Sequence, residues 1–356
     1  QIFHCFGCGV GGNVIVFLMK QERLTFKEAI VVLARKANVD INQFDRNDSN
    51  SVDDKNPFFE INALAMEYYH AILLYEKDPS AKEAREYLKS RGVTLETVQK
   101  FKIGFALNRW DGLLSFLEKK KISLALMEKT GVAIAHEQKN SFYDRFRNRI
   151  IFPIFDLQGR CIAFGGRRLN ENDPAKYINS PESPIYTKGK HLFALLLSKP
   201  SIMQLDQAVV VEGYLDCITP FQAGIINVVA SLGTALTVEQ IKQLRRFTQN
   251  ITILFDADPA GEMATLRSLD LLLEQRCHVR VATLPQGHDP DTFVREFGAE
   301  AFKERIAQVF SLFDFKLQKM IQLHGSQGVE GKGKIAALMI ETISKYSSEV
   351  VRDEYL

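Results

Sequence analysis

From residue 207 onward, short apolar runs rich in β-branched residues alternate with segments of helical spacing. The runs at 207–213, 224–231, 250–258 and 278–285 are predicted strands, and helices are predicted between them at 214–223, 237–247 and 260–275. Strands that are separated by helices pair in parallel, because the chain must cross over the sheet before it returns. The alternation therefore predicts an α/β fold with a doubly wound parallel sheet.

The rest of the chain predicts further parts of different character. Residues 42–57 are polar and rich in Asp, Asn and Ser, which is typical of a linker. Residues 149–166 predict two strands joined by a turn at Gln158 and Gly159. From about Ala299 the pattern is helical throughout, with one polar face. With 356 residues the chain is expected to form two or three domains.

Bulk composition favours a globular protein of a reducing compartment. Hydrophobic residues make up 46% of the chain and charged residues 25%. No apolar run approaches the ~18–20 residues of a membrane span, and no secretory signal is visible. Five cysteines at irregular spacing give no disulfide framework. We expect a cytoplasmic protein with no membrane partner, and the first residue, Gln1, is typical of a fragment.

Charge is distributed unevenly, although the net charge is only +2. Residues 139–199 hold 11 Lys and Arg against 5 Asp and Glu, whereas residues 205–300 hold 7 against 13. A basic segment attracts polyanions and an acidic segment captures cations. Ordinary solvated surface charge would explain this asymmetry if no motif accompanied it.

Acidic residues lie at or beyond the carboxyl ends of three predicted strands. Ligands of open α/β sheets bind at this edge. Carboxylates that converge there repel one another unless divalent cations neutralise them, and an all-oxygen ligand set selects Mg²⁺ or Mn²⁺. A single carboxylate in such a place is more often a helix N-cap or a solvated strand end, but three clusters together favour a metal site. The candidates are Glu212, Asp216, Asp256, Asp258, Asp289 and Asp291.

The stretches "VVVEGYLD", "ILFDADPAG" and "HDPDTFV" resemble the three motifs of the Toprim domain, which bacterial primases and topoisomerases share. The variants EGYLD and FDADPAG are similar to those of the DnaG-type bacterial DNA primases. The resemblance implies that Glu212, Asp256 and Asp258 are the central catalytic acids and bind the metal. Whether Glu212 is a metal ligand or a proton acceptor stays open. Three further acids complete the implied metal cluster: Asp216, Asp289 and Asp291.

The resemblance extends over nearly the whole chain. "HCFGCGVGGNVIVFLM" resembles the end of the family's zinc-binding domain, and "RFRNRIIFPIFDLQGRCIAFGGRRL" and "KYINSPESPIYTKGKHLFAL" resemble its basic N-terminal subdomain. The implied fold is a Toprim doubly wound parallel sheet, preceded by a mixed α+β basic subdomain and followed by a helical subdomain. The expected parts are the end of the zinc-binding domain (1–41), a linker (42–57), the basic subdomain (58–200), the Toprim catalytic domain (201–298) and the helical subdomain (299–356).

Cys5 and Cys8 have the C-x-x-C spacing of a zinc knuckle and lie among glycines. A structural zinc site needs four ligands, and this chain supplies two. A thioredoxin-like redox motif is the alternative, but it expects a preceding strand and a βαβ context that are absent. The family carries a Cys-x-x-His pair upstream. The resemblance therefore implies a half site for Zn²⁺, which the intact parent protein completes.

Basic residues and tyrosines are interleaved between residues 145 and 190. Cationic loops with aromatic rings suit single-stranded nucleic acid, with phosphates on the cations and bases on the rings. Aromatic residues at this spacing are equally common in a core, so the residues alone leave both interpretations open. The resemblance places Arg167, Lys176 and Lys188 at basic positions of the family's template and nucleotide groove. The expected nucleic-acid or nucleotide contacts are Arg145, Arg147, Arg167, Lys176 and Lys188.

Together these features predict a DNA primase, a nucleotidyltransferase that makes short RNA primers on a single-stranded DNA template from ribonucleoside triphosphates. A Toprim nuclease or topoisomerase would use the same acids, but a topoisomerase also needs a gate domain for which this chain has no room. A non-catalytic zinc-ribbon DNA-binding protein is the remaining alternative, and the clustered acids argue against it. The resemblance implies that the parent protein docks on the replicative helicase DnaB through a C-terminal domain, which no part of this chain resembles. We expect a monomer.

Overall fold

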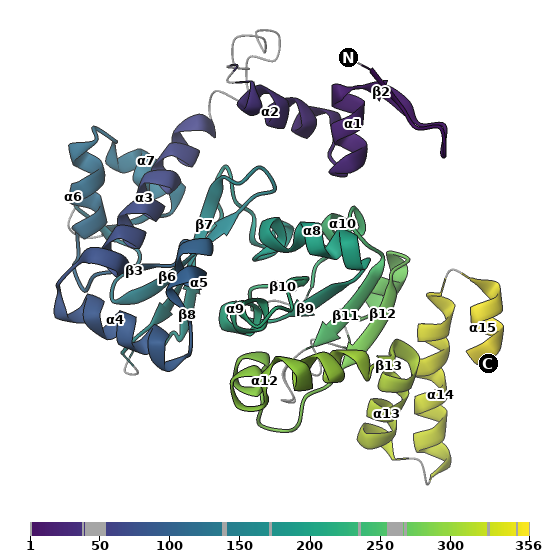
Figure 1. Cartoon of the computed structure of the whole chain (residues 1–356). Coiled ribbons are helices and arrows are strands. Elements are labelled where there is room, and N and C mark those ends of the chain that lie inside the picture. Colours follow the sequence, from purple (N-terminus) through teal and green to yellow (C-terminus); the bar gives the residue numbers. More distant parts are fainter. Residues whose placement is uncertain are drawn as a thin grey trace.

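The computed structural model of the chain describes residues 2–37, 39, 55–136, 141–170, 173–233, 236–254, 266, 269–325, 328–346 and 348–355. A mixed α/β part, a parallel-sheet part and a helical part follow one another along the chain, and a small N-terminal unit lies beside the first two (Figure 1). Within these described ranges, no helix is both long and apolar enough to cross a bilayer.

The doubly wound sheet that the sequence predicts is confirmed. Its strand order is β10-β9-β11-β12-β13, and the first four strands pair in parallel. From β9 the chain first adds β10 on one side and then β11 on the other, so the winding switches between β9 and β11. Ligand sites of such sheets lie at this switch point. The strands are β9 (Ala208–Val211), β10 (Val228–Ala230), β11 (Asn250–Leu254), β12 (His278–Ala282) and β13 (Phe310–Ser311).

Alternate residues of β9 lie in two separate hydrophobic cores. Val209 and Val211 belong to one core, and Ala208 and Val210 belong to the other. All four residues are completely buried because helices cover both faces of the sheet. This double coverage explains why the strand is apolar at every position. The helices are α9 (Tyr214–Gln222) and α12 (Pro290–Ala307) on the first face, and α8 (Leu195–Leu205) and α10 (Val238–Arg245) on the second.

The basic part is built on an antiparallel sheet with the order β3-β6-β7-β8. The predicted turn at Gln158 and Gly159 joins β6 to β7. Helix α3 (Asn56–Tyr75) packs across β3 and β7. The strands are β3 (Gly104–Ala106), β6 (Arg149–Phe155), β7 (Cys161–Arg168) and β8 (Tyr177–Asn179). The other elements of this part are α4 (Pro79–Ser90), α5 (Leu95–Lys100), α6 (Gly112–Lys119), α7 (Leu124–Thr130), the hairpin β4 (Ala133–His136) and β5 (Ser141–Asp144), and the short 3₁₀ turn η3 (Lys188–Lys190).

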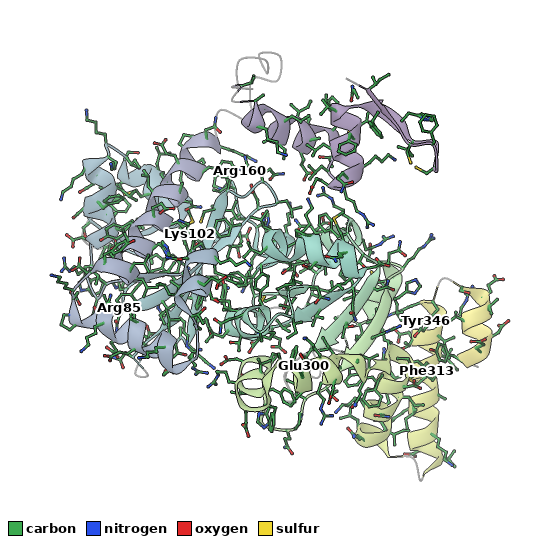
Figure 2. The ribbon with its side chains drawn as sticks, in the orientation of Figure 1. Arg85, Lys102, Arg160, Glu300, Phe313 and Tyr346 are labelled. Carbon is green, nitrogen blue, oxygen red and sulfur yellow. The ribbon has the colours of Figure 1, made fainter. Side chains whose placement is uncertain are left out.

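The C-terminal end is helical, with one exception to the prediction. Phe310 and Ser311 form β13, which pairs antiparallel with β12 and covers its edge, so the expectation of helix throughout from Ala299 is wrong there. A strand of two residues between helices is too short to leave a pattern in the sequence. Tyr355 stacks on Phe313, with ring centres 4.2 Å apart, and so holds the last helix in place. Figure 2 labels Phe313 and Tyr346 in this helical part. The helices are α13 (Leu312–His324), α14 (Val329–Ser344) and α15 (Glu349–Tyr355).

The N-terminal unit is a hairpin followed by two helices. Among its described residues, the buried members of its own core are Leu18, Leu24 and Ala29, with a few half-buried neighbours. Such a small core supplies little stability by itself. Ion pairs join the unit to the parallel-sheet part, where Glu28 contacts Arg246 after α10 and Glu22 contacts Lys199 of α8. The elements are β1 (Ile2–His4), β2 (Gly11–Asn13), α1 (Val14–Gln21) and α2 (Phe26–Lys36).

Candidate active site

Glu212 lies at the carboxyl end of β9, next to the end of β11. The parallel register pairs Val210 with Ile253, so the two strands end side by side. The main-chain carbonyl of Glu212 accepts hydrogen bonds from the N–H groups of Leu232 (3.0 Å) and Gly233 (3.3 Å), which fix the turn after β9. Glu212 thus lies at the switch point of the sheet. The predicted acids Asp256 and Asp258 follow β11 and lie outside the described residues.

Asp216 lies in the first turn of α9, four residues after Glu212. Its Oδ2 accepts a hydrogen bond of 3.0 Å from the main-chain N–H of Gly213 at the N-cap. Asp216 also acts electrostatically on Tyr177 of β8. Burial raises the pKa of Tyr177, the positive charge of Arg167 opposes that rise, and the negative charge of Asp216 adds to it. The charges of Asp216 in α9 and Arg167 in β7 therefore act on the same phenol in opposite directions.

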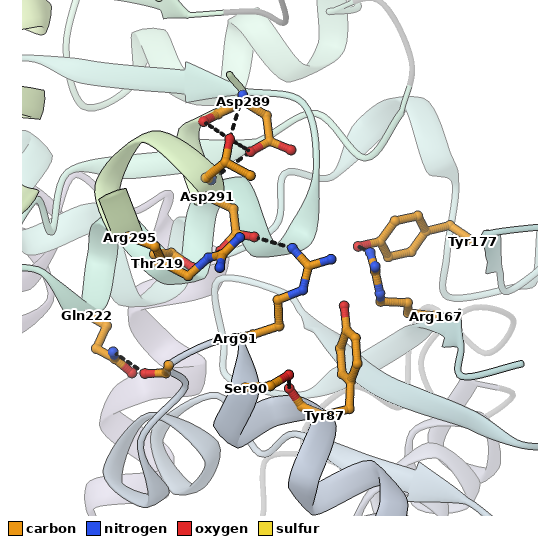
Figure 3. Close-up of polar contacts among 12 residues, drawn as sticks. Tyr87, Ser90, Arg91, Arg167, Tyr177, Thr219, Gln222, Asp289, Asp291 and Arg295 are labelled. Carbon is orange, nitrogen blue, oxygen red and sulfur yellow. Dashed lines mark hydrogen bonds and ion pairs between the residues drawn. The ribbon is translucent and has the colours of Figure 1, made fainter. Parts of the chain in front are cut away.

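Asp289 and Asp291 have different surroundings, although only Pro290 separates them. Asp289 is the N-cap of α12, and its Oδ1 accepts hydrogen bonds from the N–H (2.7 Å) and the hydroxyl (2.6 Å) of Thr292. Asp291 is only 1% exposed. Its Oδ2 accepts a bond from Arg91 (2.8 Å), as Figure 3 shows. Its Oδ1 accepts bonds from Thr219 (2.7 Å) and Arg295 (3.2 Å).

The acids that remain near the switch point suit a hard divalent cation. Within the described residues, no group of three or more His, Cys, Asp and Glu side chains is arranged to hold a metal. Glu212 and Asp216 supply oxygen donors, which fit Mg²⁺ or Mn²⁺ better than zinc. Glu212, directly after β9, and Asp216, in the first turn of α9, are four residues apart at this edge of the sheet. It engages Asp291 with arginines instead.

Arg167 of β7 meets the aromatic residues that line the boundary between the two sheets. It is 9% exposed and donates a hydrogen bond of 2.7 Å to the hydroxyl of Tyr177. Its guanidinium carbon lies 5.1 Å from the ring centre of Tyr87 and 5.2 Å from that of Tyr177. The guanidinium carbon of Arg91 lies 5.4 Å from the same Tyr87 ring. Sequence reasoning missed Arg91, because a basic residue at the end of a helix is ordinary.

The two predicted lysines border this region. Lys176 is exposed, and its main-chain carbonyl accepts a hydrogen bond of 3.1 Å from the N–H of Arg168. Lys188 is half-buried at the start of η3, and its N–H donates to Glu182 (3.0 Å). Both lysines sit in loops that hydrogen bonds hold to their neighbours. Their main chains are therefore held, and their side chains can offer positive charge to a phosphate.

The predicted residues Arg145 and Arg147 lie in different surroundings. Arg145 donates two hydrogen bonds to the main-chain carbonyl of Asn179, at 2.9 and 3.2 Å, and burial lowers the pKa of its guanidinium. Arg147 stacks on the ring of Trp110, 4.3 Å from the ring centre, and lies 5.0 Å from that of Tyr143. Trp110 is 65% exposed and is the single tryptophan of the chain. We call Trp110 and Arg147 the stacking platform.

Asp144 holds the stacking platform from below. Its two carboxylate oxygens accept hydrogen bonds from the N–H groups of Leu113 (2.8 Å) and Leu114 (3.0 Å) at the start of α6. Its own N–H donates to the carbonyl of Trp110 (2.7 Å), and its carbonyl accepts from Arg147. Burial raises the pKa of Asp144 to about 6, against the opposite effect of the hydrogen bonds from Leu113 and Leu114. Hydrogen bonds with the main chain of the buried Asp144 thus hold both members of the stacking platform, Trp110 and Arg147.

Cys5 and Cys8 form a tight turn between β1 and β2. The N–H of Cys5 donates to the carbonyl of Val10 (2.8 Å), and the N–H of Gly9 donates to the carbonyl of Cys5 (2.9 Å). Hydrogen bonds from Cys8 and then from Gly7 lower the pKa of the Cys5 thiol. A lowered pKa favours the thiolate, which is the form that binds zinc. Both thiols are exposed and fit half of a zinc site.

Three family descriptions match successive parts of the chain. A CHC2 zinc finger matches residues 1–49, the N-terminal domain of a DNA primase catalytic core matches residues 68–199, and a Toprim-like domain matches residues 209–294. The DNA primase of Halalkalibacterium halodurans is 40% identical over 357 residues, which cover 100% of this chain and 59% of that protein. The DNA primase of Clostridium acetobutylicum is 39% identical and covers 98% and 58%. The chain thus spans about three fifths of the length of these relatives.

Solved structures show the same architecture. A DNA primase domain from Pseudomonas aeruginosa is 38% identical with a TM-score of 0.76, and the match covers 84% of this chain and 94% of that one. A DnaG primase catalytic domain bound to single-stranded DNA is 34% identical with a TM-score of 0.76, over 85% and 96%. The zinc-binding and RNA polymerase domains of the Aquifex aeolicus primase are 34% identical with a TM-score of 0.73, over 100% and 83%. The acids at the switch point of a Toprim sheet, the basic subdomain beside it and the cysteine turn before it agree with these matches, and the chain belongs to the family of DnaG-type DNA primases.

Proposed function

We propose that this chain carries the RNA polymerase activity of a DNA primase and makes short RNA primers on single-stranded DNA from ribonucleoside triphosphates. The observation that supports this most is the contact between the two parts at Tyr177. Its hydroxyl accepts a hydrogen bond of 2.7 Å from Arg167, and its ring centre lies 5.8 Å from that of Tyr214, two residues after Glu212. Nucleotidyl transfer needs acids for the metal and bases for the phosphates on opposite sides of one reaction centre. The solved DnaG catalytic domain bound to single-stranded DNA supports the choice of template.

The acids of the parallel sheet would hold the metal. Bound Mg²⁺ or Mn²⁺ would neutralise the triphosphate and the leaving pyrophosphate and lower the pKa of the attacking 3′-hydroxyl. Glu212 would bind the cation or accept that proton. Asp291 also belongs to the predicted set, but its two arginine partners already neutralise its charge. The proposed metal ligands are Glu212, Asp216, Asp256, Asp258 and Asp289.

The basic part would hold the DNA template and the incoming nucleotide. Arg167, with Arg91 across the Tyr87 ring, can bind the phosphates of the incoming nucleotide as planar donors. Lys176 and Lys188 can add charge along the same side. The stacking platform can receive a template base on Trp110, since every base has a face that stacks. Arg145 would act through the carbonyl of Asn179, which it anchors.

The remaining parts of the proposal concern the parent protein. Cys5 and Cys8 would bind Zn²⁺ together with an upstream Cys-x-x-His pair of that protein. The replicative helicase DnaB would be a partner through a further domain. We also propose that the protein acts as a monomer in the bacterial cytoplasm, at the replication fork.

One assay tests the function directly. Single-stranded DNA, ribonucleoside triphosphates and Mg²⁺ or Mn²⁺ are incubated with the chain and with its full-length parent, and short RNA products are followed. We expect RNA synthesis that Asp256→Ala abolishes while the thermal unfolding curve stays unchanged. Asp353→Ala, on the exposed side of α15, is the matched control and should leave synthesis intact. A full-length protein that cuts or relaxes DNA but makes no RNA would instead support the nuclease or topoisomerase alternative.

A further inference from the structure

Arg91 and Asp291 form an ion pair that joins the basic part to the parallel-sheet part. Arg91 ends α4, and Asp291 lies in the first turn of α12. The distance from Arg91 Nη1 to Asp291 Oδ2 is 2.8 Å. Figure 3 shows the guanidinium group of Arg91 between Asp291 on one side and the Arg167–Tyr177 pair on the other. The ion pair thus lies at the boundary on which the proposed function depends.

Protein donors engage both carboxylate oxygens of Asp291. Arg91 reaches Oδ2, while Thr219 and Arg295 reach Oδ1. The side chain is 2% exposed. A ligand of Mg²⁺ must turn an oxygen toward the ion, and such a turn would remove the counter-charge from two arginines. This environment favours a task for Asp291 other than metal binding.

The geometry of Arg91 suits a contact with phosphate. Its side chain is 27% exposed, and Asp291 accepts from one of its three nitrogens, Nη1. A guanidinium carries five N–H donors in a planar fork, so donors are left for a second anion. Arg91 and Arg167 approach the same Tyr87 ring, at 5.4 and 5.1 Å from its centre. Two guanidinium groups beside one ring can together bind a polyphosphate.

A second contact holds the loop that follows Arg91. The side-chain oxygen of Gln222 in α9 accepts a hydrogen bond of 2.9 Å from the N–H of Thr94, and its amide nitrogen donates to the carbonyl of Gly92 at 2.9 Å. This pair of bonds fixes the main chain next to Arg91 against the parallel-sheet part. The remaining freedom of Arg91 lies in its long side chain. Asp291 removes that freedom.

We infer that Asp291 is a positioning residue, which orients Arg91 toward the triphosphate of the incoming nucleotide, and is not a metal ligand. The inference rests on the proposed function, because it assigns a role within the same reaction. Asp291 acts through Arg91 and touches no reacting atom. Its loss should weaken the binding of nucleotide and leave the binding of metal unchanged.

The test compares Asp291→Asn, Arg91→Ala and the double variant in the full chain. Asn keeps the shape of the side chain but removes the charge that orients Arg91. We expect KM for the ribonucleoside triphosphate to rise by about ten- to a hundredfold in each single variant, with a smaller change in kcat. The double variant should be no worse than Arg91→Ala alone, since Asp291 has no effect without Arg91. Arg295→Ala removes the other arginine of Asp291 and should change KM much less.

A direct measurement of Mn²⁺ binding by electron paramagnetic resonance, without nucleotide, separates the two roles of Asp291. We expect the same Mn²⁺ affinity for Asp291→Asn as for the unchanged protein, whereas Asp256→Ala should lower it. Weakened Mn²⁺ binding in Asp291→Asn, or additive losses in the double variant, would overturn the inference. Thermal unfolding of each variant identifies any that fail to fold, and Arg91→Lys then supplies the comparison, because Lys keeps the charge without the planar fork. Absence of RNA synthesis by the unchanged protein would instead contradict the proposed function.

Discussion

The ring of Tyr214 fills the space beside Gly165, where an added β-carbon would lie 2.1 Å from the tyrosine hydroxyl oxygen. Tyr214 opens α9 two residues after Glu212, and Gly165 lies in β7 two residues before Arg167. The Tyr214 hydroxyl also donates a hydrogen bond of 2.7 Å to Asn179. The segment that follows Glu212 therefore packs directly against β7, the strand that carries Arg167.

Gly165→Ala should disturb the packing of Tyr214 against β7. The methyl group cannot be accommodated unless Tyr214 moves, because the ring is buried and is stacked on Phe152 with centres 4.9 Å apart. We expect the free energy of unfolding to fall by about 1–3 kcal/mol, which is the usual cost of overpacking a core. RNA synthesis should fall as well, since Glu212 and Arg167 lose their mutual alignment. Urea denaturation and the primer assay measure the two effects.

Gly333→Ala is the control for that substitution. Gly333 lies in α14, and nothing lies within 4 Å of the position of its β-carbon. Alanine is the better helix former, so the free energy of unfolding should rise by up to about 1 kcal/mol. The activity should stay unchanged, because the added methyl group meets no neighbour. If Gly165→Ala were as stable and as active as Gly333→Ala, the packing of Tyr214 against Gly165 would matter for neither stability nor activity.

The parallel sheet could be predicted because its strands repeat one local pattern. Strands β9, β10 and β11 are buried almost throughout, so each reads as a continuous apolar run that ends in polar residues, whereas β12 is exposed at His278 and Arg280. The position of Glu212 at the carboxyl end of β9 follows from the same pattern. The separation of Asp289 and Asp291 could not be predicted. On an extended strand the two side chains would share a face, but α12 starts at Pro290 and turns them apart.

Contacts between distant segments could not be predicted either. Arg91 and Asp291 are 200 residues apart, and their pairing depends on how the end of α4 packs against α12. The stacking of Arg147 on Trp110 likewise requires β5 to pack beside the start of α6. Such pairings are products of tertiary packing, and no local period of apolar residues encodes them.

Asp144 should make stability depend on pH. The carboxyl is 4% exposed, and burial raises its pKa to about 6. An unfolded aspartate has a pKa of about 4, so the folded state holds the proton more tightly. This contribution to stability is complete below about pH 4 and is lost as the pH rises to about 6. The unchanged protein loses this contribution and Asp144→Asn does not. The free energy of unfolding of Asp144→Asn, minus that of the unchanged protein, should therefore rise by about 2–3 kcal/mol from pH 4 to pH 7.

Urea unfolding at several pH values checks this prediction. Asp111 raises the pKa of this carboxyl and Arg147 lowers it, while the charge of Asp144 itself adds to the raised pKa values of Tyr68 and Tyr69. Comparison of the two proteins at each pH removes the contribution of every group that they share. A stability difference that does not vary with pH would refute the assignment.

Arg246 should control the docking of the N-terminal unit. Its guanidinium binds both carboxylate oxygens of Glu28, with Nη1–Oε1 at 3.2 Å and Nη2–Oε2 at 2.5 Å. The two side chains are 28% and 17% exposed, so salt screens the pair only in part. We expect Arg246→Glu to release the unit, because like charges then face each other. Faster hydrogen exchange in α1 and α2 would report the release.

A charge exchange makes the docking test specific. Arg246→Glu combined with Glu28→Arg restores an opposite pair and should slow the exchange again. Lys242→Glu changes the same charge one turn earlier on α10, where the side chain is 54% exposed, and should leave the exchange unchanged. Equal exchange rates in all four proteins would mean that this ion pair does not hold the unit.

The stacking platform gives the chain an intrinsic reporter for single-stranded DNA. Trp110 is the single tryptophan, and it is exposed beside Arg147. A base that stacks on its ring should quench the fluorescence, and such stacking contributes about 1–3 kcal/mol. Arg147→Ala should weaken binding and reduce its salt dependence, because one phosphate contact is lost. Lys120→Ala, next to Phe116 on α6, removes an equal charge away from the platform and should have little effect. Binding without quenching would place the template elsewhere on the basic part.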